Sequence, residues 1–104
     1  MKEITPSELK SWLDQGRDFQ LVDVREIHEN ENANIGGELI PMGEVPNRIS
    51  ELSREKELVI YCRSGGRSGS IVQHLESLGF SNAINLKGGC LAWKRDIDPS
   101  LNVF

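Results

Sequence analysis

Three short apolar runs along the chain have the pattern of strands buried in a sheet. They lie at residues 20–24, 57–61 and 83–86, and each is rich in valine, isoleucine or leucine. Apolar runs of this length are typical of parallel strands that are covered on both faces. The hydrophobic pattern therefore predicts three strands of a parallel sheet.

Two segments between these runs space their apolar residues as helices do. The first covers residues 45–52, with apolar positions at Val45, Ile49 and Leu52. The second covers residues 67–78 and is closed by Gly79, with apolar positions at Ile71, Val72, Leu75 and Leu78. Both patterns predict helices with one buried face.

A third helix is predicted near the N-terminus from its capping residues. Thr5 can cap this helix, Pro6 can occupy its first position, and Glu8 can complete a capping box. Gly16 is placed to end it. The face that we expect to be buried consists of Leu9, Trp12 and Leu13.

The alternation of strands and helices predicts an α/β fold with a parallel sheet and helices on its faces. No repeat or linker-like stretch interrupts the pattern, so we expect one domain over residues 1–104. Ligands of such sheets bind beyond the carboxyl ends of the strands. Cys62 directly follows the second predicted strand and is expected at that place.

The composition narrows the classes of function. The 104 residues carry a formal net charge of −4, which gives no overall attraction to nucleic acid or to an anionic membrane. The chain has neither an apolar signal segment at its N-terminus nor an apolar run of about 20 residues, the length that spans a bilayer. We therefore expect a soluble cytoplasmic protein.

The cysteines and histidines do not form a metal-binding pattern. Cys62 and Cys90 are too few for a disulfide framework or a closed zinc site. His28 and His74 have no second ligand at metal spacing, and we expect both to face solvent. The sequence thus predicts free thiols, and it implies no metal or organic cofactor.

The segment after Cys62 has the features of an anion-binding loop. Gly65 and Gly66 can adopt backbone conformations that turn successive N–H groups inward around the sulfur. The following helix adds unpaired donors and the positive end of its dipole. Arg63 and Arg67 supply forked charged groups that match a tetrahedral oxyanion. Such surroundings typically lower a cysteine pKa from about 8.5 to between roughly 3.5 and 7.5.

Four segments of the chain resemble single-domain rhodaneses. The most specific is the loop Tyr61-Cys62-Arg63-Ser64-Gly65-Gly66-Arg67-Ser68, followed by the closing element Gly88-Gly89-Cys90-Leu91-Ala92-Trp93. Residues 21–26 and 35–41 also resemble family segments, so the resemblance covers nearly the whole chain. It implies a central five-stranded parallel sheet flanked by helices on both faces. The implied activity is the transfer of a sulfane sulfur from a donor such as thiosulfate to a thiophilic acceptor.

The resemblance also implies roles for the loop residues. Cys62 would be the nucleophile and would carry the sulfur as a persulfide. The binding residues would be Arg63, Ser64, Gly65, Gly66, Arg67 and Ser68, with the backbone holding the outer sulfur and the arginines holding the donor's oxyanion. The partners would be a small sulfur donor and a thiol or cyanide acceptor. Residues 34–52 resemble rhodanese domains fused to ubiquitin-like activating enzymes, which adds a sulfur-relay protein as a further partner.

Two other classes of function remain alternatives. An oxyanion cradle around a cysteine also occurs in tyrosine phosphatases and arsenate reductases, but those enzymes have five residues between cysteine and arginine. The chain has four between Cys62 and Arg67, a ring better matched to one sulfur than to a phosphoryl group. A binding or sulfur-carrier module without turnover is the second alternative. A binding module would have no need for the cysteine and its glycine loop.

Three further residues are assigned mainly structural roles. Asp23 and Arg25 flank the end of a predicted buried strand, where a structural ion pair is favoured over catalysis. Cys90 could resolve the Cys62 persulfide as a disulfide or relay its sulfur, but packing is favoured.

Overall fold

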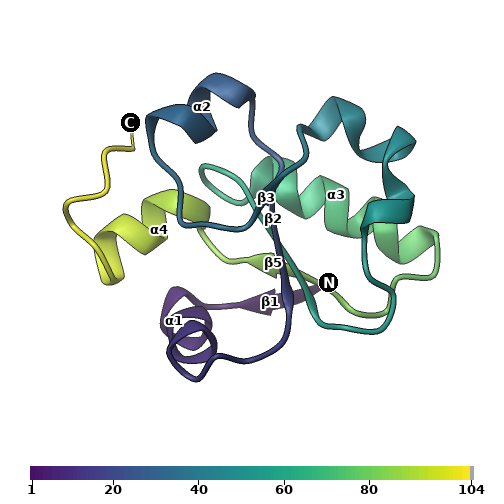
Figure 1. Ribbon diagram of the computed structural model, residues 1–104, viewed down its shortest axis with the longest axis horizontal. Helices are drawn as coiled ribbons and strands as arrows, with labels where there is room; N and C mark the ends of the chain where they lie inside the picture. The colour runs from purple at the N-terminus through teal and green to yellow at the C-terminus, as the bar shows by residue number, and fades with distance from the viewer. Residues whose placement is uncertain (104) are drawn as a thin grey trace.

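The computed structural model describes residues 1–103 and contains a five-stranded parallel sheet with the order β1-β5-β4-β2-β3. The strands are β1 (Lys2–Ile4), β2 (Gln20–Asp23), β3 (Glu38–Leu39), β4 (Leu58–Tyr61) and β5 (Ala83–Leu86). β4 is the central strand, and β1 and β3 are the two edges (Figure 1). The parallel sheet predicted from the hydrophobic pattern, and its five strands implied by the resemblance, are confirmed.

Helices cover both faces of the sheet. They are α1 (Pro6–Asp14), α2 (Ile27–Asn32), α3 (Gly66–Ser77) and α4 (Gly89–Asp96), with the 3₁₀ helices η1 (Met42–Asn47) and η2 (Ile49–Glu51). α3 lies on one side of the sheet, and α1 and α4 lie on the other (Figure 1). One apolar cluster joins α3 and η1 to the sheet, and a second joins α1 and α4 to its other face.

The side chains of β4 alternate between the two clusters. Leu58 and Ile60 pack in the cluster with α3, whereas Val59 and Tyr61 pack in the cluster with α1 and α4. All four are buried, which explains why this strand appears in the sequence as a continuous apolar run. The next residue in the alternation, Cys62, belongs to the α3 side.

The capping residues of α1 act as predicted. The amide of Glu8 donates to the Thr5 hydroxyl, and the amide of Thr5 donates to the Glu8 carboxylate. Gly16, with a φ of +64°, follows the helix end. The predicted buried face was wrong at Leu13, which is 41% exposed in the last turn because it borders an open surface groove beside Phe19.

The α-helix predicted over residues 45–52 was wrong. The segment forms the two 3₁₀ helices, closed by bonds from the Arg48 amide to the Val45 carbonyl and from the Leu52 amide to the Ile49 carbonyl. Pro46 has no N–H to donate to a carbonyl one α-turn earlier, so it favours the tighter turn. Val45 and Leu52 are nevertheless buried as their spacing predicted.

The other predicted helix is confirmed, and α2 was missed. α3 begins one residue before the predicted start and is followed by Gly79, with a φ of +89°. α2 has no buried residue, and so no apolar stripe marks it in the sequence. Its one sequence signal is the capping box between Glu26 and Glu29. Among residues 1–103, no helix is long and apolar enough to cross a membrane.

Candidate active site around Cys62

Cys62 lies at the carboxyl end of the central strand β4, where the chain turns through residues 63–65 into α3. The residue is 1% exposed, so its sulfur is surrounded by the loop that follows it. Three donors face the sulfur: the Gly65 amide at 3.1 Å, the Ser68 amide at 3.4 Å and the Ser68 hydroxyl at 3.3 Å. The predicted cradle of inward-facing donors is present in the structure.

These donors decide the acidity of the thiol. Burial raises the pKa of Cys62, but the hydrogen bonds from the Ser68 hydroxyl and from the amides of Ser68, Gly65 and Ser64 lower it more. The pKa of Cys62 is therefore below its ordinary value. The loop favours the thiolate, which is the nucleophilic form of cysteine.

The two loop glycines have different roles. Gly65 has a φ of +99°, a conformation that side chains rarely adopt, and a Cβ there would lie 3.3 Å from the Gly88 amide nitrogen. Gly66 has no positive φ, and a Cβ there would meet nothing within 4 Å. The expectation that both glycines need special backbone conformations is thus met at Gly65 and wrong at Gly66, which is the first residue of α3.

Asn85 of β5 binds two residues of the loop, and its role was missed by the sequence analysis. Its side-chain nitrogen donates to the Gly65 carbonyl at 3.2 Å, and its side-chain oxygen lies 2.6 Å from the Ser68 hydroxyl. Asn85 is 3% exposed, and it is the one polar residue in the buried strand β5. A polar residue in an otherwise apolar buried strand was the signal available in the sequence.

The start of α4 packs against the other side of the loop. The amides of Cys90 and Leu91 donate to the carbonyls of Cys62 and Arg63 at 2.9 and 3.0 Å. A Cβ on Gly89 would lie 2.4 Å from the Cys62 carbonyl oxygen, so this contact requires glycine. The sequence marked Gly88-Gly89 as part of the closing element, and the fit of this pair against the cysteine loop was missed. By binding these carbonyls, α4 orients the loop so that later amides face the sulfur.

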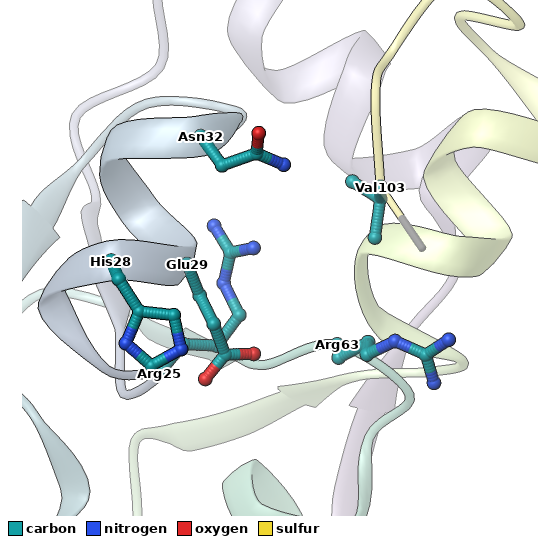
Figure 2. A pocket seen from close by; sticks show the side chains of 6 residues that line it. All are labelled: Arg25, His28, Glu29, Asn32, Arg63 and Val103. Atoms are coloured by element: carbon teal, nitrogen blue, oxygen red, sulfur yellow. The ribbon is translucent and has the colours of Figure 1, made fainter.

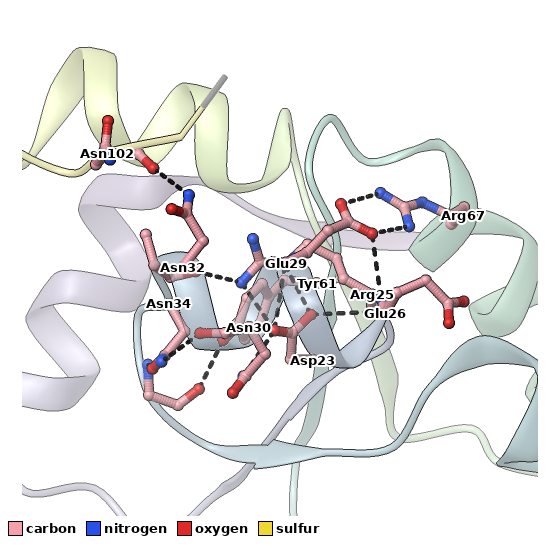
Figure 3. A network of polar contacts seen from close by, with 12 residues as sticks. Asp23, Arg25, Glu26, Glu29, Asn30, Asn32, Asn34, Tyr61, Arg67 and Asn102 are labelled. Carbon is pink, nitrogen blue, oxygen red and sulfur yellow. Dashed lines mark hydrogen bonds and ion pairs between the residues drawn. The ribbon is translucent and has the colours of Figure 1, made fainter.

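The two loop arginines have different surroundings. The Arg67 guanidinium forms two hydrogen bonds to the carboxylate of Glu29, at 2.7 and 2.9 Å (Figure 3). Arg63 is exposed and lines a pocket of about 430 Å³ (Figure 2). That pocket lies between α2 and the C-terminal segment, and its other lining residues are Arg25, His28, Glu29, Asn32 and Val103.

A buried polar network joins the end of β2 to α2. The Arg25 guanidinium binds the Asp23 carboxylate at 2.8 Å and the Ala33 carbonyl at 2.7 Å (Figure 3). The Arg25 amide also donates to Asp23, and the Asn30 side chain donates to the same carboxylate at 3.0 Å. The predicted structural ion pair is confirmed, and it fixes the loop that leads from β2 into α2.

Cys90 is a packing residue by its surroundings. It is fully buried in the cluster with α1 and α4, whereas Cys62 belongs to the α3 cluster. Burial raises the pKa of Cys90 to about 12. Neither cysteine is in a disulfide.

His28 and His74 are exposed, as expected, and residues 1–103 contain no group of three or more acidic, cysteine or histidine residues placed to hold a metal.

Known proteins are similar to this chain in sequence and in fold. The family model described as "Rhodanese-like domain" matches residues 5–96. The chain is 38% identical over 96 residues to an Allochromatium vinosum protein named "Sulfurtransferase", and the match covers 91% of this chain and 90% of that one. The structure matches the crystal structure of a rhodanese-like domain protein from Staphylococcus aureus with a TM-score of 0.85 and 35% identity, covering 100% of this chain and 99% of that one.

The chain spans only part of the length of several relatives. The "Probable adenylyltransferase/sulfurtransferase MoeZ" of Mycobacterium tuberculosis is 36% identical over 104 residues. The match covers 97% of this chain but only 26% of that protein.

Proposed function

Because the chain belongs to the rhodanese-like domain family, we propose that it is a sulfurtransferase that carries sulfane sulfur as a persulfide on Cys62. The observation that carries this proposal is the set of hydrogen-bond donors around the Cys62 sulfur. They stabilise negative charge on the sulfur and lower the pKa of the thiol. An amide-lined loop of this kind suits a persulfide anion, which carries its charge on the outer sulfur.

The reaction is a double displacement. The Cys62 thiolate attacks the outer sulfur of the donor, and the donor's S–S bond breaks with its electron pair on the leaving group. With thiosulfate as donor, the leaving group is sulfite. An acceptor thiolate or cyanide then attacks the outer sulfur of the Cys62 persulfide, forming a persulfide or thiocyanate and regenerating the thiolate.

The loop residues divide the work of binding. The backbone of residues 63–68 holds the transferred sulfur, with Gly65 and Ser68 as the nearest donors to Cys62. Arg63 and Arg67 bind the charged part of a small donor. Arg67 must share or exchange its contact with Glu29 to do so. α3 begins at Gly66, and the positive N-terminal end of its helix dipole stabilises the anion.

The acceptor is a thiol, cyanide or a protein of a sulfur relay. Relatives of this chain include a protein whose name combines adenylyltransferase and sulfurtransferase activities, which supports a relay context. In that context the single rhodanese-like domain takes sulfur from one partner and passes it to another. Transfer from a protein persulfide would then be faster than turnover of thiosulfate.

Intact mass spectrometry tests the proposal. Reduced wild-type protein, Cys62→Ser and Cys90→Ala are exposed briefly to thiosulfate or to a persulfide donor, then to a reducing thiol. Wild type and Cys90→Ala are expected to gain one sulfur atom that the thiol removes, and Cys62→Ser is expected to gain none. If wild type gains no sulfur from either donor, the sulfurtransferase proposal is wrong.

A further inference from the structure

The carboxylate of Glu29 occupies the hydrogen-bonding face of Arg67. Its two oxygens accept from the two terminal nitrogens of the guanidinium at 2.7 and 2.9 Å (Figure 3). This forked geometry is the one by which arginine also binds the oxygens of sulfur and phosphorus oxyanions. Glu29 therefore takes the place that the oxyanion end of a donor would need.

Glu29 competes with a donor oxyanion for Arg67 in neutral solution. The hydrogen bonds from Arg67 lower the pKa of Glu29 to about 2, so this carboxylate is charged in neutral solution. Glu26 also contributes negative charge near Arg67. An incoming dianion thus meets an arginine whose charge is neutralised by Glu29, with Glu26 as a second acidic group nearby.

The pair stands where it can affect the reaction. Arg67 lies in the first turn of α3, five positions after Cys62 along the chain, and the two groups interact electrostatically. The Arg67 side chain is 36% exposed and that of Glu29 is 21% exposed, so small ions in solvent can reach the pair. Glu29 comes from α2, a helix without buried residues, and it links α2 to the cysteine loop.

We propose that Glu29 is a specificity-determining residue, which selects against oxyanion donors such as thiosulfate and leaves donors without an oxyanion largely unaffected. This inference rests on the proposed function and names the substrate class of the same site. A persulfide of a neutral thiol or of a peptide needs no contact with Arg67. Its leaving group is a thiolate, which has no oxyanion for the guanidinium to bind. A thiosulfate molecule must displace Glu29 from Arg67 or share the guanidinium with it.

The test compares two donors in wild type and in Glu29→Gln. Glutamine removes the charge but keeps a side-chain oxygen that can accept from the Glu26 amide, as Glu29 does at 3.1 Å. We expect kcat/KM for thiosulfate, with cyanide as acceptor, to rise about 5- to 30-fold. With hydroxyethyl persulfide as donor, kcat/KM is expected to change by less than about twofold.

Glu31→Gln is the matched control. It removes the same charge from the same helix at an exposed position, without altering the Arg67 pair. A thiosulfate gain of equal size in Glu31→Gln would show that bulk charge is responsible. Equal changes for both donors in Glu29→Gln, or a loss of thiosulfate activity in a variant with a native circular dichroism spectrum, would overturn the inference.

A second measurement does not depend on sulfur transfer. Sulfate is an unreactive oxyanion, and its binding at Arg67 should protect Cys62 from alkylation by iodoacetamide. We expect protection at lower sulfate concentrations in Glu29→Gln than in wild type and Glu31→Gln. If the sulfurtransferase proposal fails but this protection appears, Glu29 still controls oxyanion access. If protection is unchanged in Glu29→Gln, the inference about Glu29 is wrong, whether or not the sulfurtransferase proposal holds.

Discussion

The hydroxyl oxygen of Ser68 lies 2.6 Å from the side-chain oxygen of Asn85. The Asn85 amide nitrogen donates to the Gly65 carbonyl, which fixes its side-chain oxygen as an acceptor toward Ser68. A hydroxyl has one proton, so Ser68 can donate either to Asn85 or to the Cys62 sulfur at 3.3 Å. The charge state of the sulfur is therefore coupled to a buried amide of the neighbouring strand.

Replacing Ser68 by alanine is expected to raise the pKa of Cys62, because the hydroxyl hydrogen bond is the largest contribution that lowers it. The pH dependence of the rate of Cys62 alkylation by iodoacetamide measures this pKa directly. Its midpoint should move to higher pH in Ser68→Ala.

Ser64→Ala is the control for this experiment. Ser64 is exposed and acts on the sulfur through its backbone amide, which the substitution retains. Its alkylation profile should match that of wild type. An unchanged midpoint in Ser68→Ala would mean that the backbone amides alone set the acidity of the thiol.

The loop glycines form a matched pair for a stability test. Gly65→Ala is expected to lower the free energy of unfolding by about 1–3 kcal/mol, because alanine at a φ of +99° is strained. Gly66→Ala should leave the stability unchanged or raise it by up to about 1 kcal/mol, because alanine favours the helix that begins there. Urea denaturation of both variants measures the difference. Equal losses in the two variants would contradict the assigned conformations.

The sequence predicted the main elements where burial leaves a periodic signal. β4 is buried on both faces and α3 has one buried stripe, so their residue patterns carry the information. The edge strands β1 and β3 are only three and two residues long and have no comparable pattern. The 3₁₀ form of residues 42–51 depends on the local effect of Pro46, which the spacing of apolar residues does not reveal.

The site was predictable where its residues are consecutive. Cys62 and its loop follow one strand, so a short motif contains them. Glu29, Asn85 and Gly89 reach the loop from α2, β5 and α4, and only the folded sheet brings them together. Their roles depend on contacts across 20 or more positions in the chain, for which the sequence gives weak signals such as one polar residue in an apolar strand.

Cys62 is expected to react with alkylating reagents much faster than Cys90 at neutral pH. Burial raises the pKa of Cys90 to about 12, whereas the loop lowers that of Cys62. Peptide mapping after brief treatment with iodoacetamide should find the label on Cys62.

Cys90→Ala should retain persulfide formation and lose about 1 kcal/mol of stability, because it removes a buried sulfur from a packed cluster. Loss of sulfur transfer in a folded Cys90→Ala protein would instead assign this thiol a part in the relay.

The ion pair of Glu29 and Arg67 should make stability depend on pH in the acid range. The pKa of Glu29 is lowered from 4.5 to about 2 in the folded protein, mainly by hydrogen bonds from Arg67. A group with a lowered folded pKa stabilises the protein above its unfolded pKa, and this contribution is lost as the pH falls through the folded value.

The difference in free energy of unfolding between wild type and Glu29→Gln should therefore be largest near neutral pH and should shrink as the pH falls from 4.5 to about 2. Because the Arg67 side chain is 36% exposed, solvent screens the pair, and we expect a difference of about 1 kcal/mol at neutral pH. Urea denaturation at several pH values gives this difference, with Glu31→Gln as the exposed control. A difference that stays constant over this range would mean that Glu29 stabilises the fold through its packing or its bond to the Glu26 amide. The ion pair between Glu29 and Arg67 would then contribute little to the free energy of unfolding.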